Sequence, residues 1–383
     1  MAMFRYFLTL ISVCVVTGVY AGDTVSAPAS LPPRKGGVGL EVNLISGRII
    51  RHSASFTAPV PAMSYALDVN IVWQSYGQKP WQQPLGYPLY GAGITLTDYR
   101  SPRIFGKCAG IYPYVQIPLV RVGQFEWTFR FGVGVAYVTK RYSLGPDIDT
   151  INTAVSTHVN AFACLYTDLR YRLNEQLDLQ AGGNLTHISN ALYREPNLGV
   201  NMVGAHVGIR YFPGTSSPDR IMRKMPPVRK RWLAEARVGI SHKEARAEGS
   251  PVKAAYIGAL SVSRRVNGHN KVFAGIDAAY HKDVLAFLIN YGIEIGHEKK
   301  HSWDGGFFVG DEFIVGRLGL MAAVGVYYRQ TFLDFDPIYQ RMGGKYYILT
   351  RERGPVKELF LSALLNTHGV VAEYAEFGMG VSF

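Results

Sequence analysis

From Gly36 to its last residue, the chain alternates between apolar and polar residues in runs separated by turn-rich pieces. A period of two is typical of β-strands whose two faces meet different surroundings. Runs of about ten residues are also the length that a tilted strand needs to cross a membrane. Because hydrocarbon cannot satisfy a free strand edge, membrane-crossing strands must close into a barrel.

The alternating runs form two series of eight. The first series lies near residues 36–46, 63–73, 89–99, 110–120, 125–138, 156–171, 176–189 and 201–212. The second lies near residues 231–243, 252–264, 271–281, 302–314, 316–329, 338–350, 357–367 and 371–383. Even strand numbers are usual in bacterial barrels. The spacing fits two eight-stranded barrels in tandem or one larger barrel. Between two runs, Asp283–Gly292 has apolar residues at helical spacing and predicts a short helix.

The last run, Tyr374–Phe383, has the clearest two-faced pattern. One face carries Phe377, Met379, Val381 and Phe383, and the other carries Glu376, Gly378, Gly380 and Ser382. Apolar residues that face lipid and small or polar residues that face the interior are expected of a membrane barrel. A terminal aromatic on an amphipathic last strand resembles the assembly signal of bacterial outer-membrane barrels. The sequence therefore predicts an all-β, antiparallel outer-membrane barrel rather than a soluble β-sandwich.

Residues 1–21 are expected to form a cleaved signal peptide. Met1–Arg5 is basic, Tyr6–Tyr20 is apolar, and Ala21 provides a small residue at the cleavage position. No later segment approaches 18 uninterrupted apolar residues, so no membrane-spanning helix is predicted. Two cysteines follow the predicted signal, Cys108 and Cys164. Outside the cytoplasm they could form a disulfide, or they could be unpaired small apolar residues.

The predicted domain order is a flexible lead-in at 22–35, an eight-stranded barrel at 36–213, a basic linker at 214–230 and a second barrel-like region at 231–383. The formal net charge of the chain is +12. Nucleic acid is an implausible partner for an exported chain, whereas an anionic membrane surface suits the charge. The basic run Arg220–Arg231 is interpreted as a solvated linker.

Three polar residues interrupt the apolar face of two neighbouring strands. In Leu177–Ser189 the face shared by Leu177, Leu179 and Leu185 continues to His187 and Ser189. In the next strand the face of Val203, Val207 and Ile209 extends back to Asn201. Antiparallel pairing brings Asn201 near His187. Histidine can activate a serine hydroxyl as a nucleophile, and polar groups facing lipid are costly unless they serve a function.

The surrounding residues resemble a known family. The segments His187–Ala191 and Pro196–Asn201 are similar to the signature of the lipid A 3-O-deacylases (PagL-type, acyloxyacyl hydrolase-like). Gly132–Lys140 and Ser156–Phe162 resemble versions from Bacteroidetes-type bacteria, here with a C-terminal extension. The resemblance covers roughly residues 36–213. It implies an eight-stranded outer-membrane barrel that hydrolyses the 3-O-linked ester of lipid A on its lipid-facing exterior.

The resemblance also assigns roles to residues. His187 would be the general base, Ser189 the nucleophile, and Asn190 would help to hold the oxyanion with the backbone N–H groups that follow it. The well-studied enzymes carry glutamate at the third position, where this chain has Asn201. An amide can orient the imidazole but cannot stabilise its positive charge, so we expect a weaker or altered enzyme. Glu195 is a second candidate for the orienting role.

The implied substrate is lipid A or lipopolysaccharide in the outer leaflet of a Gram-negative outer membrane. No cofactor or metal is expected, and a homodimer is possible. The segment His297–His301 matches the zinc-protease pattern His-Glu-x-x-His, but flanking glycines favour a charged loop. The alternative function is a non-enzymatic barrel, either a porin-like channel or a structural envelope protein. The residues of the second half do not indicate its function.

Overall fold

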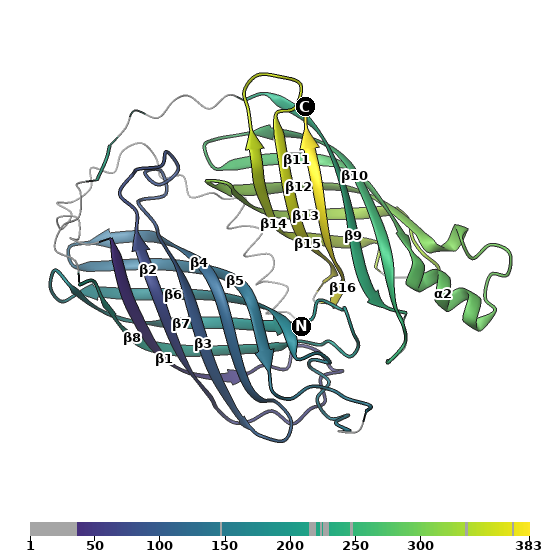
Figure 1. Cartoon of the computed structure of the whole chain (residues 1–383), viewed down its shortest axis with the longest axis horizontal. Helices are drawn as coiled ribbons and strands as arrows, with labels where there is room; N and C mark the ends of the chain where they lie inside the picture. The colour runs from purple at the N-terminus through teal and green to yellow at the C-terminus, as the bar shows by residue number, and fades with distance from the viewer. Residues whose placement is uncertain are drawn as a thin grey trace. The chain divides into compact units, whose positions relative to one another are not determined.

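The computed structural model describes residues 37–145, 148–213, 220–222, 224, 230–245, 248–333, 336–369 and 371–383. The predicted signal peptide (1–21) and lead-in (22–35) lie outside the described residues, as do positions 214–219, 223 and 225–229 of the predicted linker. The described residues form two closed antiparallel barrels, which Figure 1 shows in purple to teal and in green to yellow. The chain divides into two compact units around these barrels.

The first barrel contains eight strands in sequence order. They are β1 (Val38–Ile49), β2 (Ser64–Gln74), β3 (Leu89–Ser101), β4 (Gly106–Val122), β5 (Phe125–Val138), β6 (Val159–Arg172), β7 (Leu177–Ser189) and β8 (Val200–Tyr211). The barrel closes where β8 pairs with β1, with Leu40 opposite Tyr211 and Ile49 opposite Met202. Closure removes every free edge, as a membrane setting requires.

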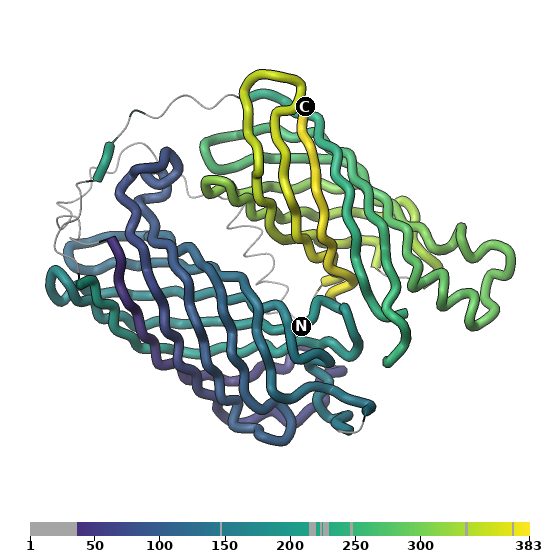
Figure 2. Tube along the Cα trace, viewed as in Figure 1, coloured from purple at the N-terminus to yellow at the C-terminus, as the bar shows by residue number. Residues whose placement is uncertain are grey.

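The second barrel repeats this plan. Its strands are β9 (Trp232–Glu244), β10 (Val252–Arg265), β11 (Asn270–His281), β12 (Trp303–Val315), β13 (Leu318–Arg329), β14 (Ile338–Thr350), β15 (Glu358–His368) and β16 (Val371–Ser382). β16 closes the barrel against β9, with Phe377 opposite Ile240. Figure 2 shows both traces closing on themselves. Of the two arrangements that the spacing allowed, the chain therefore adopts tandem barrels.

The predicted helix is present as α2 (Lys282–Tyr291), which follows β11 directly. A 3-10 turn, η1 (Lys300–Ser302), precedes β12. Among the described residues, no helix is long and apolar enough to cross a membrane.

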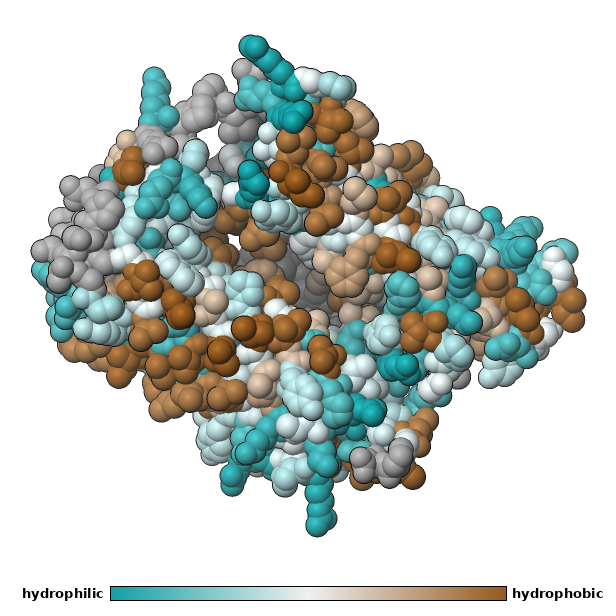
Figure 3. Space-filling model, viewed as in Figure 1, coloured by the Kyte–Doolittle hydropathy of each residue, from teal (hydrophilic) through white to brown (hydrophobic). Residues whose placement is uncertain are grey.

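Both barrels are apolar outside and polar inside. In β1 the exposed residues Leu40, Val42 and Leu44 alternate with Glu41 and Asn43, which are fully buried. Figure 3 shows broad apolar areas over the strands. This is the reverse of a soluble protein and the pattern of a strand between lipid and a polar lumen. The predicted all-β outer-membrane barrel is confirmed.

The interior of the first barrel is filled by a charged network. Glu41 pairs with Arg130 and Arg210, and all three side chains are fully buried. Asp168 accepts from His206 at 2.6 Å, and Gln116 connects Asp168 to Arg210. An eight-stranded barrel is just wide enough for such side chains, and these buried charges pair both with neighbouring strands, as Glu41 does with Arg210, and across the lumen, as Glu41 does with Arg130. Cys108 and Cys164 are buried and free, so they do not form the disulfide that the sequence left open.

Aromatic pairs mark one end of the first barrel. Trp73 stacks on Tyr90 and Phe125 contacts Tyr171, at centroid distances of 6.2 and 4.9 Å. All four lie where even-numbered strands end or odd-numbered strands begin. Aromatic girdles at the level of the lipid headgroups are characteristic of bacterial membrane barrels.

Candidate active site

The candidate site lies at the opposite end, where β1 and β7 end and β8 begins. We call this end the site rim. His187 is paired with Asn201 across β7 and β8, and Ser189 is the last residue of β7. His187 shares its side of the strand with the exposed Leu179, so the strand alternation directs it to the outer surface. The structure thus brings together the three residues expected from the sequence.

These polar side chains are nevertheless shielded. Ser189 is 8% exposed and Asn201 is 2% exposed, although their positions lie on the outer side of the barrel. The segment after β1 extends along β8, because the Ile50 N–H donates to the Asn201 carbonyl at 2.9 Å. The segment before β8 is held by the Gly199 N–H, which donates to the Ala154 carbonyl at 2.7 Å. Loops at the site rim therefore remove most of the cost of polar groups on an apolar wall.

The hydrogen bonds of His187 assign its tautomer. Its Nδ1 lies 2.7 Å from Asn201 Oδ1, and its Nε2 lies 2.9 Å from Ser189 Oγ. An amide oxygen can only accept, so Nδ1 carries the proton and Nε2 is free to accept from the serine hydroxyl. This is the geometry in which an imidazole removes a proton from a serine nucleophile. The partner of Nδ1 is Asn201 rather than Glu195.

A fourth residue extends the chain of hydrogen bonds. Asn201 Nδ2 lies 3.0 Å from His52 Nδ1 in the segment that follows β1. Because an amide nitrogen only donates, Nδ1 of His52 must accept, which requires a neutral His52. Partial burial lowers the pKa of His52 below its usual value, although hydrogen bonds to the backbone of Ile50 and Leu198 oppose the shift. The neutral form therefore prevails, and the contact fixes which way the Asn201 amide points.

Sequence reasoning missed His52, which is 149 positions from Asn201. The missing step was barrel closure. Since β1 pairs with β8, a residue just after β1 reaches the same rim as a residue at the start of β8. The only sequence signal was a histidine a few residues after the first predicted run.

Asn190 lies beside the three residues but has its own partners. Its backbone N–H donates to Asn197 Oδ1 at 2.8 Å, and its side-chain Nδ2 donates to Ser156 Oγ at 2.9 Å. The next two residues, Ala191 and Leu192, have backbone φ of 54° and 64°. Non-glycine residues in this left-handed region cost about 1–3 kcal/mol each, and such strain gathers at functional sites.

Position 199 must be a glycine because the His187 side chain lies so close to it. Its φ is +77°, and a Cβ added there would lie 2.8 Å from His187 Cε1. Both the backbone conformation and the contact exclude a side chain. The glycine therefore lets the segment before β8 press against the imidazole.

The His297–His301 pattern does not form a zinc helix. α2 ends at Tyr291, His297 lies in a turn, and His301 lies in η1. His301 Nε2 instead faces Glu294 Oε2 at 3.4 Å. The two histidines do not share a helix face, which the metalloprotease motif requires.

Two family models match the chain in sequence. "Lipid A 3-O-deacylase (PagL)" matches residues 64–210, and "Acyloxyacyl hydrolase, C-terminal domain" matches residues 236–383. No curated protein matches the chain. The first match includes β7, most of β8 and the residues His187, Ser189 and Asn201. The second includes nearly the whole of the second barrel.

Among solved structures, the outer membrane enzyme PagL is 14% identical over 44% of this chain and 97% of its own, with a TM-score of 0.31. Neisserial surface protein A is 12% identical over 46% of this chain and 97% of its own, with a TM-score of 0.31. A mutant porin of Rhodopseudomonas blastica is 8% identical over 90% and 100%, with a TM-score of 0.18.

Closed barrels with apolar exteriors, together with these family matches, define an outer-membrane β-barrel protein of a Gram-negative bacterium. The two family models together cover most of the described chain. The chain belongs to the lipid A 3-O-deacylase family, including that family's C-terminal domain.

Proposed function

We propose that this protein removes the 3-O-linked acyl chain of lipid A by a serine–histidine mechanism in its first barrel. The observation that carries the proposal is the hydrogen-bonded series Ser189–His187–Asn201 on the outer surface. Membership of the deacylase family supports lipid A as the substrate. A site on the outside of a barrel reaches a substrate that is itself a membrane lipid.

The chemistry follows from the tautomer of His187. Nε2 takes the Ser189 proton while Oγ attacks the ester carbonyl carbon, which becomes a tetrahedral oxyanion. His187 then returns this proton to the departing 3-oxygen of the sugar, leaving an acyl group on Ser189. A water molecule activated by the same imidazole releases the fatty acid and restores the serine.

Two groups would stabilise the charged states. Asn190 and backbone N–H groups beside it are proposed as the oxyanion donors, which typically contribute about 2.7–4 kcal/mol each. Asn201 would hold the imidazole in its reactive tautomer. It offers no negative charge to the imidazolium, so we propose a slower enzyme than one with a carboxylate at this position.

The leaflet follows from the lengths of the connections. At the site rim the connections are residues 50–63, 102–105, 139–158 and 190–199, whereas at the other end they are residues 75–88, 123–124 and 173–176, so most of the longer connections lie at the site rim. Longer loops are extracellular in bacterial barrels. The site would then lie in the outer leaflet, where lipopolysaccharide is found.

Mass spectrometry of lipid A tests the proposal. Cells that produce the protein should lose one 3-linked hydroxyacyl chain, and cells that produce Ser189→Ala should not. Ser46→Ala is a matched control, because Ser46 is a half-buried outward-facing serine of β1. Unchanged lipid A with the folded wild-type protein would instead favour the non-enzymatic barrel.

A further inference from the structure

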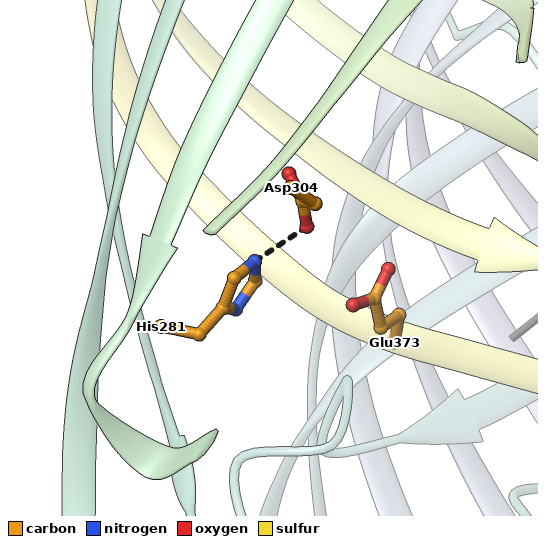
Figure 4. Close-up of side chains that lie close together, drawn as sticks. All are labelled: His281, Asp304 and Glu373. Atoms are coloured by element: carbon orange, nitrogen blue, oxygen red, sulfur yellow. Dashed lines mark hydrogen bonds and ion pairs between the residues drawn. The ribbon is translucent and has the colours of Figure 1, made fainter. Parts of the chain in front are cut away.

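Buried ionisable side chains gather at one end of the second barrel. His281 ends β11, Asp304 is the second residue of β12 and Glu373 lies near the start of β16. All three are buried, and one potential ligand atom from each lies within 4.8 Å of the others. Figure 4 shows the three side chains converging from separate strands. None belongs to the candidate active site.

Glu373 is held in place by several donors. Its Oε2 accepts from Asn366 Nδ2 at 2.8 Å, lies 3.0 Å from His368 Nε2 and accepts from Tyr327 Oη at 3.3 Å. Its other oxygen, Oε1, is 4.0 Å from Lys243 Nζ. The donors fix the carboxylate so that Oε1 remains available to a further cation.

His281 has one engaged nitrogen and one without a hydrogen bond. Nε2 lies 2.6 Å from Asp304 Oδ2. Nδ1 is buried and makes no hydrogen bond among the described residues, but it faces Asp283 Oδ1 at 3.8 Å. Asp283 is placed there by the first turn of α2 and pairs with Lys243 at 3.2 Å. A histidine between a ligand position and a second carboxylate is the usual arrangement around protein-bound metals.

The charges in this cluster do not balance. Asp283, Asp304 and Glu373 are buried carboxylates, and the buried ammonium of Lys243 lies near two of them, Asp283 and Glu373. Isolated buried charge is strongly unfavourable. A divalent cation held between His281, Asp304 and Glu373 would offset this excess of buried negative charge.

We propose that this cluster binds one divalent transition-metal ion, Zn²⁺ or Mn²⁺. The ligands are His281 Nε2, an oxygen of Asp304 and Oε1 of Glu373, with water completing the shell. One imidazole nitrogen and two carboxylate oxygens suit these ions better than Ca²⁺ or Mg²⁺, which prefer oxygen alone. When the ion binds Nε2 of His281, the single N–H of the neutral imidazole moves from Nε2 to Nδ1, where it can donate to Asp283.

The fit requires only small movements. Ligands about 2.1 Å from a common ion are about 3.4 Å apart in a tetrahedral shell. This spacing is wider than the 2.6 Å between His281 Nε2 and Asp304 Oδ2 and lies within the 4.8 Å that encloses the three ligand atoms. Rotations of the Asp304 and Glu373 side chains would bring the ligand atoms to this spacing.

Metal binding to the full mature chain, refolded in detergent without a histidine tag, tests this proposal. After dialysis against ZnCl2, elemental analysis should find one ion per chain, and Co²⁺ should give a visible spectrum typical of nitrogen and oxygen ligands. Glu373→Gln and Asp304→Asn should each weaken binding at least tenfold. Asp283→Asn, which leaves all three ligands intact, should weaken it about 10–100-fold.

Three controls separate this site from others. Asp311→Asn changes a buried carboxylate at the opposite end of the same barrel and should bind like the wild type. The double variant His297→Ala/His301→Ala removes the decoy motif, and Ser189→Ala removes the proposed nucleophile. Both should retain the ion. Circular dichroism establishes that each variant is folded.

A wild-type chain that binds no Zn²⁺, Mn²⁺ or Co²⁺ at pH 7.5 would overturn the proposal. Equal binding by folded Glu373→Gln would also overturn it. If the ligand variants do not fold, the absence of a Co²⁺ spectrum in the wild type, or normal binding by Asp283→Asn, has the same consequence. None of these outcomes depends on lipid A hydrolysis.

Discussion

Each barrel has a histidine near the end of its next-to-last strand, but the two side chains face opposite sides of the barrel wall. His187 lies near the end of β7 and His368 ends β15, each in the next-to-last strand of its barrel. His187 faces outward and contacts Ser189, whereas His368 faces the interior and contacts Glu373. In a strand, successive residues face opposite sides. A shift of one position along the strand therefore decides whether a side chain faces the membrane or the lumen.

The segments that follow these strands differ as well. Residues 190–199 connect β7 to β8 and, with the segment around His52, shield the polar groups. β15 and β16 are joined by a tight turn at Gly369. A polar site on the outer surface must be shielded from lipid, and among the described residues such shielding segments lie beside His187 of the first barrel. His368 of the second barrel lies inside against Glu373 and needs no such cover.

The largest effect is expected from Ser189→Ala, because it removes the nucleophile. Deacylation of lipid A should fall by roughly 10³-fold or more, to the level of cells without the protein. The matched change in the second barrel is Ser362→Ala, because Ser362 is a buried, inward-facing serine of β15. It should leave deacylation unchanged. If both variants, folded in the membrane, lost activity equally, the assignment of the chemistry to the first barrel would fail.

Asn201 tests whether the orienting residue limits the rate. Asn201→Ala removes the acceptor of the His187 Nδ1–H and should lower turnover roughly 10²-fold. Asn201→Glu supplies a carboxylate that also stabilises the imidazolium, so turnover should rise. Turnover is measured on purified lipid A in detergent. An unchanged rate in Asn201→Ala would remove Asn201 from the mechanism and make Glu195→Gln the next variant to test.

The alternation in the sequence predicted all sixteen described strands to within a few residues, because the lipid-facing and inward sets differ so strongly in polarity. The helix α2 was predicted separately, from apolar residues at helical spacing. The same alternation placed His187, Ser189 and Asn201 on one face. Closure of two barrels rather than one was not predictable, since strand spacing is the same in both. The contact of His52 with Asn201 and the cluster around Glu373 were missed because each joins residues distant in sequence.

Gly199 and Gly369 allow a matched test of the two turns. Both have positive φ, +77° and +62°, so alanine should cost about 1–2 kcal/mol of stability at either position. Only at Gly199 would the new Cβ also meet His187, whereas nothing lies within 4 Å at Gly369. Gly199→Ala should therefore lower turnover about tenfold by displacing the imidazole. Gly369→Ala should lose no more stability than Gly199→Ala and should keep full turnover. Equal turnover in the two variants would contradict the close packing against His187.

The smallest effect is expected at His52, which acts only through Asn201. Burial lowers the pKa of His52 below 6.5, so the unfolded chain binds its proton at a higher pH than the folded chain does. Stability from the neutral His52 is therefore present above pH 6.5 and is lost as the pH falls through the lower, folded pKa. In His52→Gln an amide oxygen can still accept from Asn201 without titrating. This variant should keep turnover within about threefold at pH 8 and lose less stability than the wild type between pH 8 and pH 5. Urea unfolding at the two pH values measures the difference. If the wild type loses no more stability between the two pH values than His52→Gln does, His52 is not held neutral against Asn201. The hydrogen-bonded series would then consist of Ser189, His187 and Asn201 alone.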